Sequence, residues 1–174
     1  MAIAADQTNP VLITAGLILA RTGKTADAVK VADTLANRVE IDAQAYARLI
    51  QAEVSLAQRK PIDALNQVRE GQKLADTWVG RVILARIYLE RNEFATAARE
   101  IDTALRRSGE ATAVALDDVP TFRYFPALHF YKGLAEAGVS SPDAGKNFQA
   151  FLAIKANGDE TGGLVAEARK RQTP

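Results

Sequence analysis

Apolar and small residues recur at helical spacing through residues 82–105, in a pattern that the rest of the chain repeats. Leu84, Ala85 and Tyr88 fall at i, i+1 and i+4, which places them on one face of a helix. Twelve residues after Ala85, Ala97 begins a second run with the same period. The stretch therefore predicts two amphipathic helices folded back on one another, with Ala85 and Ala97 where the helices approach most closely.

Pairs of small residues with this separation occur elsewhere in the chain. Gly16 and Ala28 are twelve residues apart, as are Ala52 and Ala64, so each pair predicts another hairpin. The last predicted helix is polar on most of its surface, as the terminal element of a stack must be. We expect residues 1–9 to be a lead-in and residues 10–174 to form one all-α domain, with hairpins at about 10–38, 42–75, 78–107 and 126–155 and a capping helix at about 161–171.

The register of the small residues also predicts an insert before the last hairpin. The interval is 36 residues from Ala28 to Ala64 and 33 from Ala64 to Ala97, but 47 from Ala97 to Ala144. We place the extra residues at 108–122. A dense group of aromatic residues follows, and its side chains either pack to anchor the insert or line a groove for a partner. This aromatic group consists of Phe122, Tyr124, Phe125, Phe130 and Tyr131.

Several residues have the chemistry expected at helix ends. Asn9, Asp42 and the pair Asp76-Thr77 are predicted N-caps, because their side-chain oxygens can accept hydrogen bonds from the first turn of a helix. Gly23 lies where a chain that leaves a helix needs a left-handed backbone. Arg59 occupies the matching place in the second hairpin, where glycine would be the common choice.

The string Gly23-Lys24-Thr25 also matches the end of a phosphate-binding loop of the Walker A type. That motif requires a glycine five residues upstream, where this chain has Ile18, and a preceding strand, whereas residues 10–22 have helical periodicity. We therefore interpret the string as a turn between antiparallel helices.

Composition narrows the function classes. Among 174 residues there are 22 Lys and Arg and 21 Asp and Glu, so the formal net charge of +1 creates no global field that would attract nucleic acid or an acidic membrane surface. The longest apolar run, residues 10–20, is about half the length of a bilayer-spanning helix. We expect a soluble domain without membrane insertion, and cytoplasm and periplasm both remain open because the chain has no cysteine.

Candidate catalytic chemistry is sparse. The single histidine, His129, has no cysteine to join it in a metal site and no evident acid–base partner, and we expect it to be a partly buried helix residue. Asp117 and Asp118 are adjacent carboxylates without the further oxygen ligands that a hard cation needs. We expect no catalytic residues, no cofactor and no metal, and hence no enzyme.

The order of Leu84, Ala85 and Tyr88, followed by Ala97 and Ile101, resembles the tetratricopeptide repeat. Residues 76–171, and above all the run GEATAVALDDVPTFRYFPALHFYKGL, are similar to the repeat region that lies C-terminal to serine/threonine kinase or cyclase domains in bacterial signalling proteins. Those relatives often have two prolines where this chain has Pro126-Ala127. The resemblance implies a right-handed α-solenoid of about four hairpins with a C-terminal cap, and a regulatory or interaction segment of a larger signalling protein.

The resemblance also implies a concave groove lined by the first helix of each hairpin, where a protein or peptide partner binds. Its exposed positions would be Arg21, Tyr46, Leu49, Glu53, Val82, Arg86, Leu89, Glu90 and Phe130. Glu53 and Arg86 would face the same groove, either paired in a surface salt bridge or with Arg86 free to hold a ligand carboxylate. The alternative function is a self-association module that forms a homodimer through an apolar end of the stack.

Overall fold

The computed structural model describes residues 7–111 and 121–172, and in this part of the chain all regular secondary structure is helical. This confirms the predicted all-α class. Most of the predicted lead-in and most of the predicted insert, including Asp117 and Asp118, lie outside the described residues. The helices are α2 (Asn9–Arg21), α3 (Thr25–Ala36), α4 (Ile41–Ala57), α5 (Pro61–Leu74), α6 (Trp78–Glu90), α7 (Phe94–Arg106), α8 (Phe125–Gly138), α9 (Ala144–Ile154) and α10 (Gly163–Gln172), with short 3-10 turns η1 (Ser108–Ala111) and η2 (Phe122–Tyr124).

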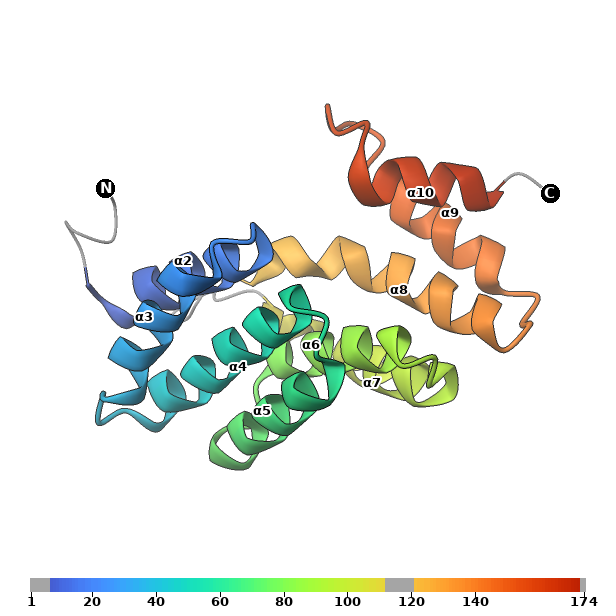
Figure 1. The fold of residues 1–174 in the computed structure, drawn as a ribbon. Helices are drawn as coiled ribbons and strands as arrows, with labels where there is room; N and C mark the ends of the chain where they lie inside the picture. Colours follow the sequence, from blue (N-terminus) through green and yellow to red (C-terminus); the bar gives the residue numbers. More distant parts are fainter. Residues whose placement is uncertain (1–6, 112–120, 173–174) are drawn as a thin grey trace.

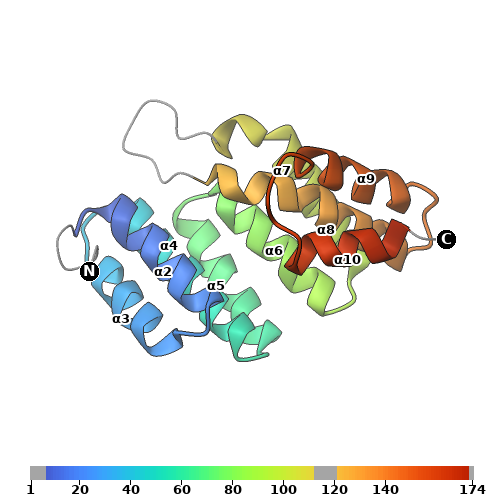
Figure 2. The ribbon, with the colours of Figure 1, turned by 90° about the horizontal axis from the view of Figure 1, so that it is seen from above.

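Helices that are consecutive in sequence pack as adjacent pairs. Figure 1 shows α2 beside α3, α4 beside α5, α6 beside α7 and α8 beside α9, and the last helix, α10, lies on α9. Successive pairs also touch, since α2 contacts α4, and α7 contacts α8. Figure 2, which views the molecule from above, shows α8 next to α6 and α7, with α10 covering the end of the molecule.

The structure confirms one of the predicted N-caps and places two others inside the helices. Thr77 caps α6 as predicted, because its hydroxyl oxygen accepts a hydrogen bond from the Gly80 N–H at 3.1 Å. Asn9 lies inside α2, whose N-cap is Thr8. Asp42 lies in the first turn of α4, where the N-cap is Glu40, so its predicted capping role is wrong. A carboxylate in the first turn still interacts favourably with the positive end of the helix dipole.

The four helical pairs are closed by turns of one geometry. Two residues after the first helix ends, the backbone enters the left-handed region, with φ of 80° at Gly23, 59° at Arg59, 58° at Asn92 and 57° at Ser140. The N–H of the following residue donates to the carbonyl five residues earlier at 2.8–2.9 Å in all four turns. This bond pattern satisfies carbonyls that a helix end leaves unpaired. Gly23-Lys24 therefore forms a helix-to-helix turn, as expected.

Arg59 adopts this left-handed backbone without glycine's conformational freedom, and its replacement should stabilise the fold. A side chain with a Cβ is strained there by about 1 kcal/mol. We expect Arg59→Gly to raise the free energy of unfolding by about 0.5 to 1 kcal/mol, measured by urea denaturation followed by circular dichroism. Asn92→Gly is the matched control and should gain less, because asparagine tolerates the left-handed region. Equal stability of wild type and Arg59→Gly would contradict the prediction.

Small residues allow the helices of a pair to approach closely, as the sequence pattern predicts. A Cβ added at Gly16 on α2 would lie 3.1 Å from Cγ1 of Val31 on α3, and one at Gly133 on α8 would lie 2.7 Å from the Phe148 ring on α9. Ala85 and Ala97 are fully buried. Gly145, in contrast, is open, because an added Cβ there would meet nothing within 4 Å.

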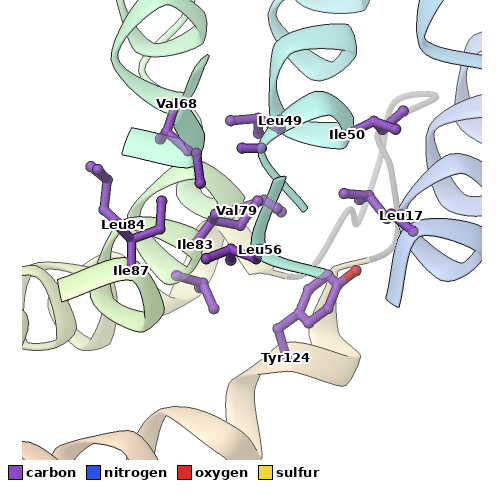
Figure 3. Close-up of a cluster of buried hydrophobic side chains, with 14 of the residues drawn as sticks. Leu17, Leu49, Ile50, Leu56, Val68, Val79, Ile83, Leu84, Ile87 and Tyr124 are labelled. Carbon is purple, nitrogen blue, oxygen red and sulfur yellow. The ribbon is translucent and has the colours of Figure 1, made fainter. Parts of the chain in front are cut away.

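The core of the described chain divides into two clusters of buried side chains. The larger runs from α2 through α7 to α8 and includes Tyr124 of η2, which is 4% exposed. Figure 3 shows Tyr124 below α4, near Leu56 and facing Leu17. The smaller cluster, formed by Phe130, Phe148, Phe151, Val165 and Ala168, joins α8, α9 and α10. Of the two explanations for the aromatic group, packing is the one that holds for Tyr124.

Candidate functional site

The predicted groove is partly filled in the structure. Leu49, Val82 and Phe130 are at most 1% exposed, and Glu53 is 2% exposed, so the expectation that these side chains face solvent is wrong. Leu49 and Val82 belong to the main core, whereas the Phe130 ring packs against Phe148 and Phe151. The physical reason is that neighbouring helices cover these positions, since Leu49 lies beside Val68 of α5 and the Phe130 ring lies against α9.

Five of the predicted groove residues keep access to solvent. Arg21 and Glu90 are classed as exposed, and Tyr46, Arg86 and Leu89 are partly buried. Tyr46 and Leu89 pack their apolar parts against the main core. A ligand on this face would therefore meet two arginines, one carboxylate and two partly apolar side chains.

Glu53 on α4 lies between Arg21 on α2 and Arg86 on α6. Nε and Nη2 of Arg21 donate to Oε1 of Glu53 at 3.0 and 2.8 Å, and Nη1 of Arg86 donates to the same oxygen. The side chain of Glu53 is 1% exposed, compared with 29% for Arg21 and 20% for Arg86. Glu53 and Arg86 thus pair as one of the two alternatives predicted, but the pair is buried and includes a second arginine.

The ion pairs of this arginine–glutamate network favour the charged forms of Glu53 and Arg86. Burial raises the pKa of Glu53, but Arg86 and Arg21 lower it more, so the net result is a pKa below the ordinary value. Burial lowers the pKa of Arg86, and Glu53 reverses this, so its pKa lies above the ordinary value. The network therefore holds two positive charges and one negative charge at neutral pH.

The pKa of Glu90, at the end of α6, is shifted by the charges of the same network. Burial raises its pKa, Arg86 opposes that effect, and Glu53 adds to it, so the net pKa lies above the ordinary value. This carboxylate neutralises part of the surplus positive charge near Arg86 when it is ionised.

A segment distant in sequence completes the site. The guanidinium carbon of Arg21 lies 4.4 Å from the ring centroid of Tyr124, and that of Arg123 lies 4.6 Å from it. Nη2 of Arg123 also donates to the Tyr124 hydroxyl at 2.8 Å. Cations over an aromatic face are attracted by its quadrupole. The sequence analysis did not single out Arg123, and it counted Tyr124 only as a member of the aromatic group, because no periodic pattern links η2 to α2.

The remaining candidate chemistry is limited. His129 is partly buried on α8, with its ring edge-on to Phe125 at 5.8 Å, and burial lowers its pKa, helped by the charge of Lys132. Within residues 7–111 and 121–172, no three His, Cys, Asp or Glu side chains gather as possible metal ligands. In the same ranges no helix combines the length and apolar character needed to cross a membrane.

Comparison with known proteins names no relative. Protein-family models, curated proteins and solved structures were all compared with the chain, and none of them matches it. The arrangement of helices and charges therefore carries the functional argument.

Proposed function

We propose that this chain is a non-catalytic protein- or peptide-binding scaffold, built as a right-handed solenoid of four tetratricopeptide-like hairpins with α10 as its cap. The observation that carries the proposal is the four-fold recurrence of one turn, with a left-handed residue at Gly23, Arg59, Asn92 and Ser140. Repeated hairpins stacked in sequence create extended surfaces suited to binding partners. From the sequence resemblance we further propose that the scaffold is a regulatory or interaction segment of a larger bacterial signalling protein.

The binding surface that we propose is the face formed by α2, α4 and α6. Arg21, Tyr46, Arg86, Leu89 and Glu90 would contact the partner, because they retain access to solvent. Glu53, which is buried beneath this face, would fix the orientation of both guanidinium groups through its hydrogen bonds. Side chains held in this way lose little conformational entropy when a ligand binds.

The test uses residues whose removal leaves the arginine–glutamate network intact. Peptides would be selected from a random displayed library on the immobilised full chain, and their affinities measured for the wild type and for a Tyr46→Ala, Leu89→Ala double variant. We expect the double variant to bind about tenfold or more weakly, because partly buried aromatic and apolar side chains provide much of the energy of an interface.

Ile62→Ala is the matched control, because Ile62 is an exposed apolar residue on α5, with 62% of its surface accessible. This control should bind the selected peptides as the wild type does. Helical circular dichroism should be unchanged in every variant. If the double variant retains full affinity for all selected peptides, the proposed binding face is wrong.

Self-association is the second candidate function, and two exposed apolar residues of the first hairpin favour it. Ile18 on α2 and Val29 on α3 are 47% and 38% exposed. A homodimer formed through this end of the stack would bury both. Sedimentation of the full chain distinguishes the candidates, since a dimer that dissociates in an Ile18→Ser, Val29→Ser variant would support self-association.

A further inference from the structure

A shallow hollow of about 360 Å³ lies between α5, α6 and α7, away from the face just described. Leu84 and Tyr88, one helical turn apart on α6, form its apolar floor. At 3.6 residues per turn, positions 84 and 88 point to the side of α6 opposite position 86, where Arg86 joins the arginine–glutamate network. The hollow is therefore a separate surface.

Two polar groups at this hollow have no partner in the described part of the chain. Arg69 on α5 is exposed and makes no hydrogen bond or ion pair with any residue of 7–111 or 121–172. The Tyr88 hydroxyl also lacks a partner in those ranges, although the residue is only 8% exposed. Among the described side chains no buried polar atom is left without a hydrogen bond, so this hydroxyl reaches solvent.

Hydrogen bonds fix two other residues that line the hollow, Arg81 of α6 and Gln72 of α5. Arg81 binds Asp76 through Nε and Nη2 at 3.0 and 2.9 Å, and its Nη1 donates to Glu100 at 3.1 Å. Gln72 accepts hydrogen bonds from the Thr77 N–H and hydroxyl at 2.9 and 3.1 Å. Glu100, the acidic residue that lines the hollow, is thus paired with Arg81, which leaves the guanidinium of Arg69 as the charge open to a ligand.

Lys73, also on α5, can add a second positive charge. Its Nζ lies 2.7 Å from Oε1 of Glu70, with 72% and 56% of the two side chains exposed. Ion pairs this exposed contribute about 0 to 1 kcal/mol and rearrange readily. Lys73 can therefore turn toward a ligand at little cost.

We propose that this hollow binds an acidic side chain of a partner protein together with an adjacent apolar one. A carboxylate matches the groups that are open, since a guanidinium donates to it in a fork and a phenolic hydroxyl adds a third donor. The floor of Leu84 and the Tyr88 ring requires an apolar neighbour beside that carboxylate. Pockets of this volume lie at the small end of the range for ligand sites, which suits one or two side chains.

The experiment titrates the full-length, ¹⁵N-labelled chain with the capped peptide acetyl-Leu-Glu-Leu-amide and follows its NMR spectrum. We expect saturable shifts in the backbone amides of Leu84 and Tyr88 and in Nε of Arg69. The peptide with Gln in place of Glu should bind about tenfold more weakly, because it loses a charged hydrogen bond. Arg69→Gln should weaken binding of the Glu peptide by a similar factor.

Arg99→Gln is the matched control variant, because Arg99 is an exposed arginine on α7 that donates only to Thr96 within the described chain. It should bind like the wild type, as should the Tyr46→Ala, Leu89→Ala variant, so the outcome is independent of the proposed function. Equal affinity for the Glu and Gln peptides would overturn the proposal. So would shifts at the hollow with inorganic phosphate but none with the Glu peptide.

Discussion

Glu53→Gln should lower the free energy of unfolding by about 3 kcal/mol at neutral pH, because it removes the buried carboxylate that Arg21 and Arg86 share as hydrogen-bonded counter-charge. Removing one partner of a buried ion pair costs about 3 to 5 kcal/mol, and the lower end applies here because both arginines retain some exposure. Urea denaturation of the wild type and the variant measures the difference. Glu70→Gln, which removes an exposed pair with Lys73, should cost less than about 1 kcal/mol.

The same network makes the cost depend on pH. The pKa of Glu53 lies below its ordinary value of 4.5 in the folded chain, so its ionisation stabilises the fold fully above that value. The stabilisation is lost as the pH falls through the lower, folded-state pKa. The difference between wild type and Glu53→Gln should therefore shrink in acid, and a difference that stays constant down to the acid transition would contradict the assigned role of Glu53.

Phe130→Ala should cost about 3 to 5 kcal/mol and should loosen one end of the molecule first. Phe130 is 1% exposed and packs against Phe148 and Phe151 at centroid distances of 5.7 and 5.6 Å, so the substitution opens a cavity in the smaller cluster. Amide hydrogen exchange should accelerate in α9 and α10 while α4 and α6 remain protected.

Phe130→Leu is the control, because it keeps most of the volume and should cost less than about 1.5 kcal/mol. An equal increase of exchange in every helix of Phe130→Ala would show that the two clusters unfold as one unit. Exchange unchanged in α9 and α10 would show that Phe130 does not hold these helices.

Sequence periodicity predicted the helices well because their information is local. The pattern around Ala85 and Ala97 predicts two helices, and the outer ends of α6 and α7, Trp78 and Arg106, agree to one residue with the predicted hairpin at 78–107. The prediction of Asp42 as an N-cap failed because α4 begins at Ile41, with Glu40 as its N-cap, two residues earlier than predicted. Capping depends on the backbone path before the helix, which periodicity does not encode.

The predicted groove was less accurate because exposure depends on contacts between distant segments. Register alone correctly placed Glu53 and Arg86 side by side. It did not predict that α5 would cover Leu49 or that α9 would cover Phe130, and so it counted buried residues as accessible. Arg21 was predicted as a groove residue, but its contact with the Tyr124 ring joins two parts of the chain that share no sequence pattern.

The contact between Arg21 and Tyr124 has a consequence for how the chain folds. Helix pairs that touch only their neighbours can form one after another, with short loops to close at each step. Here Arg21, at the end of α2, meets Tyr124, just before α8, so this contact closes a loop that contains the five helices α3 to α7. Closing this loop costs conformational entropy before the contact contributes any favourable energy. That entropic cost grows with the logarithm of the loop length. The face of α2 is therefore completed late in folding, after most of the chain has been synthesised and ordered.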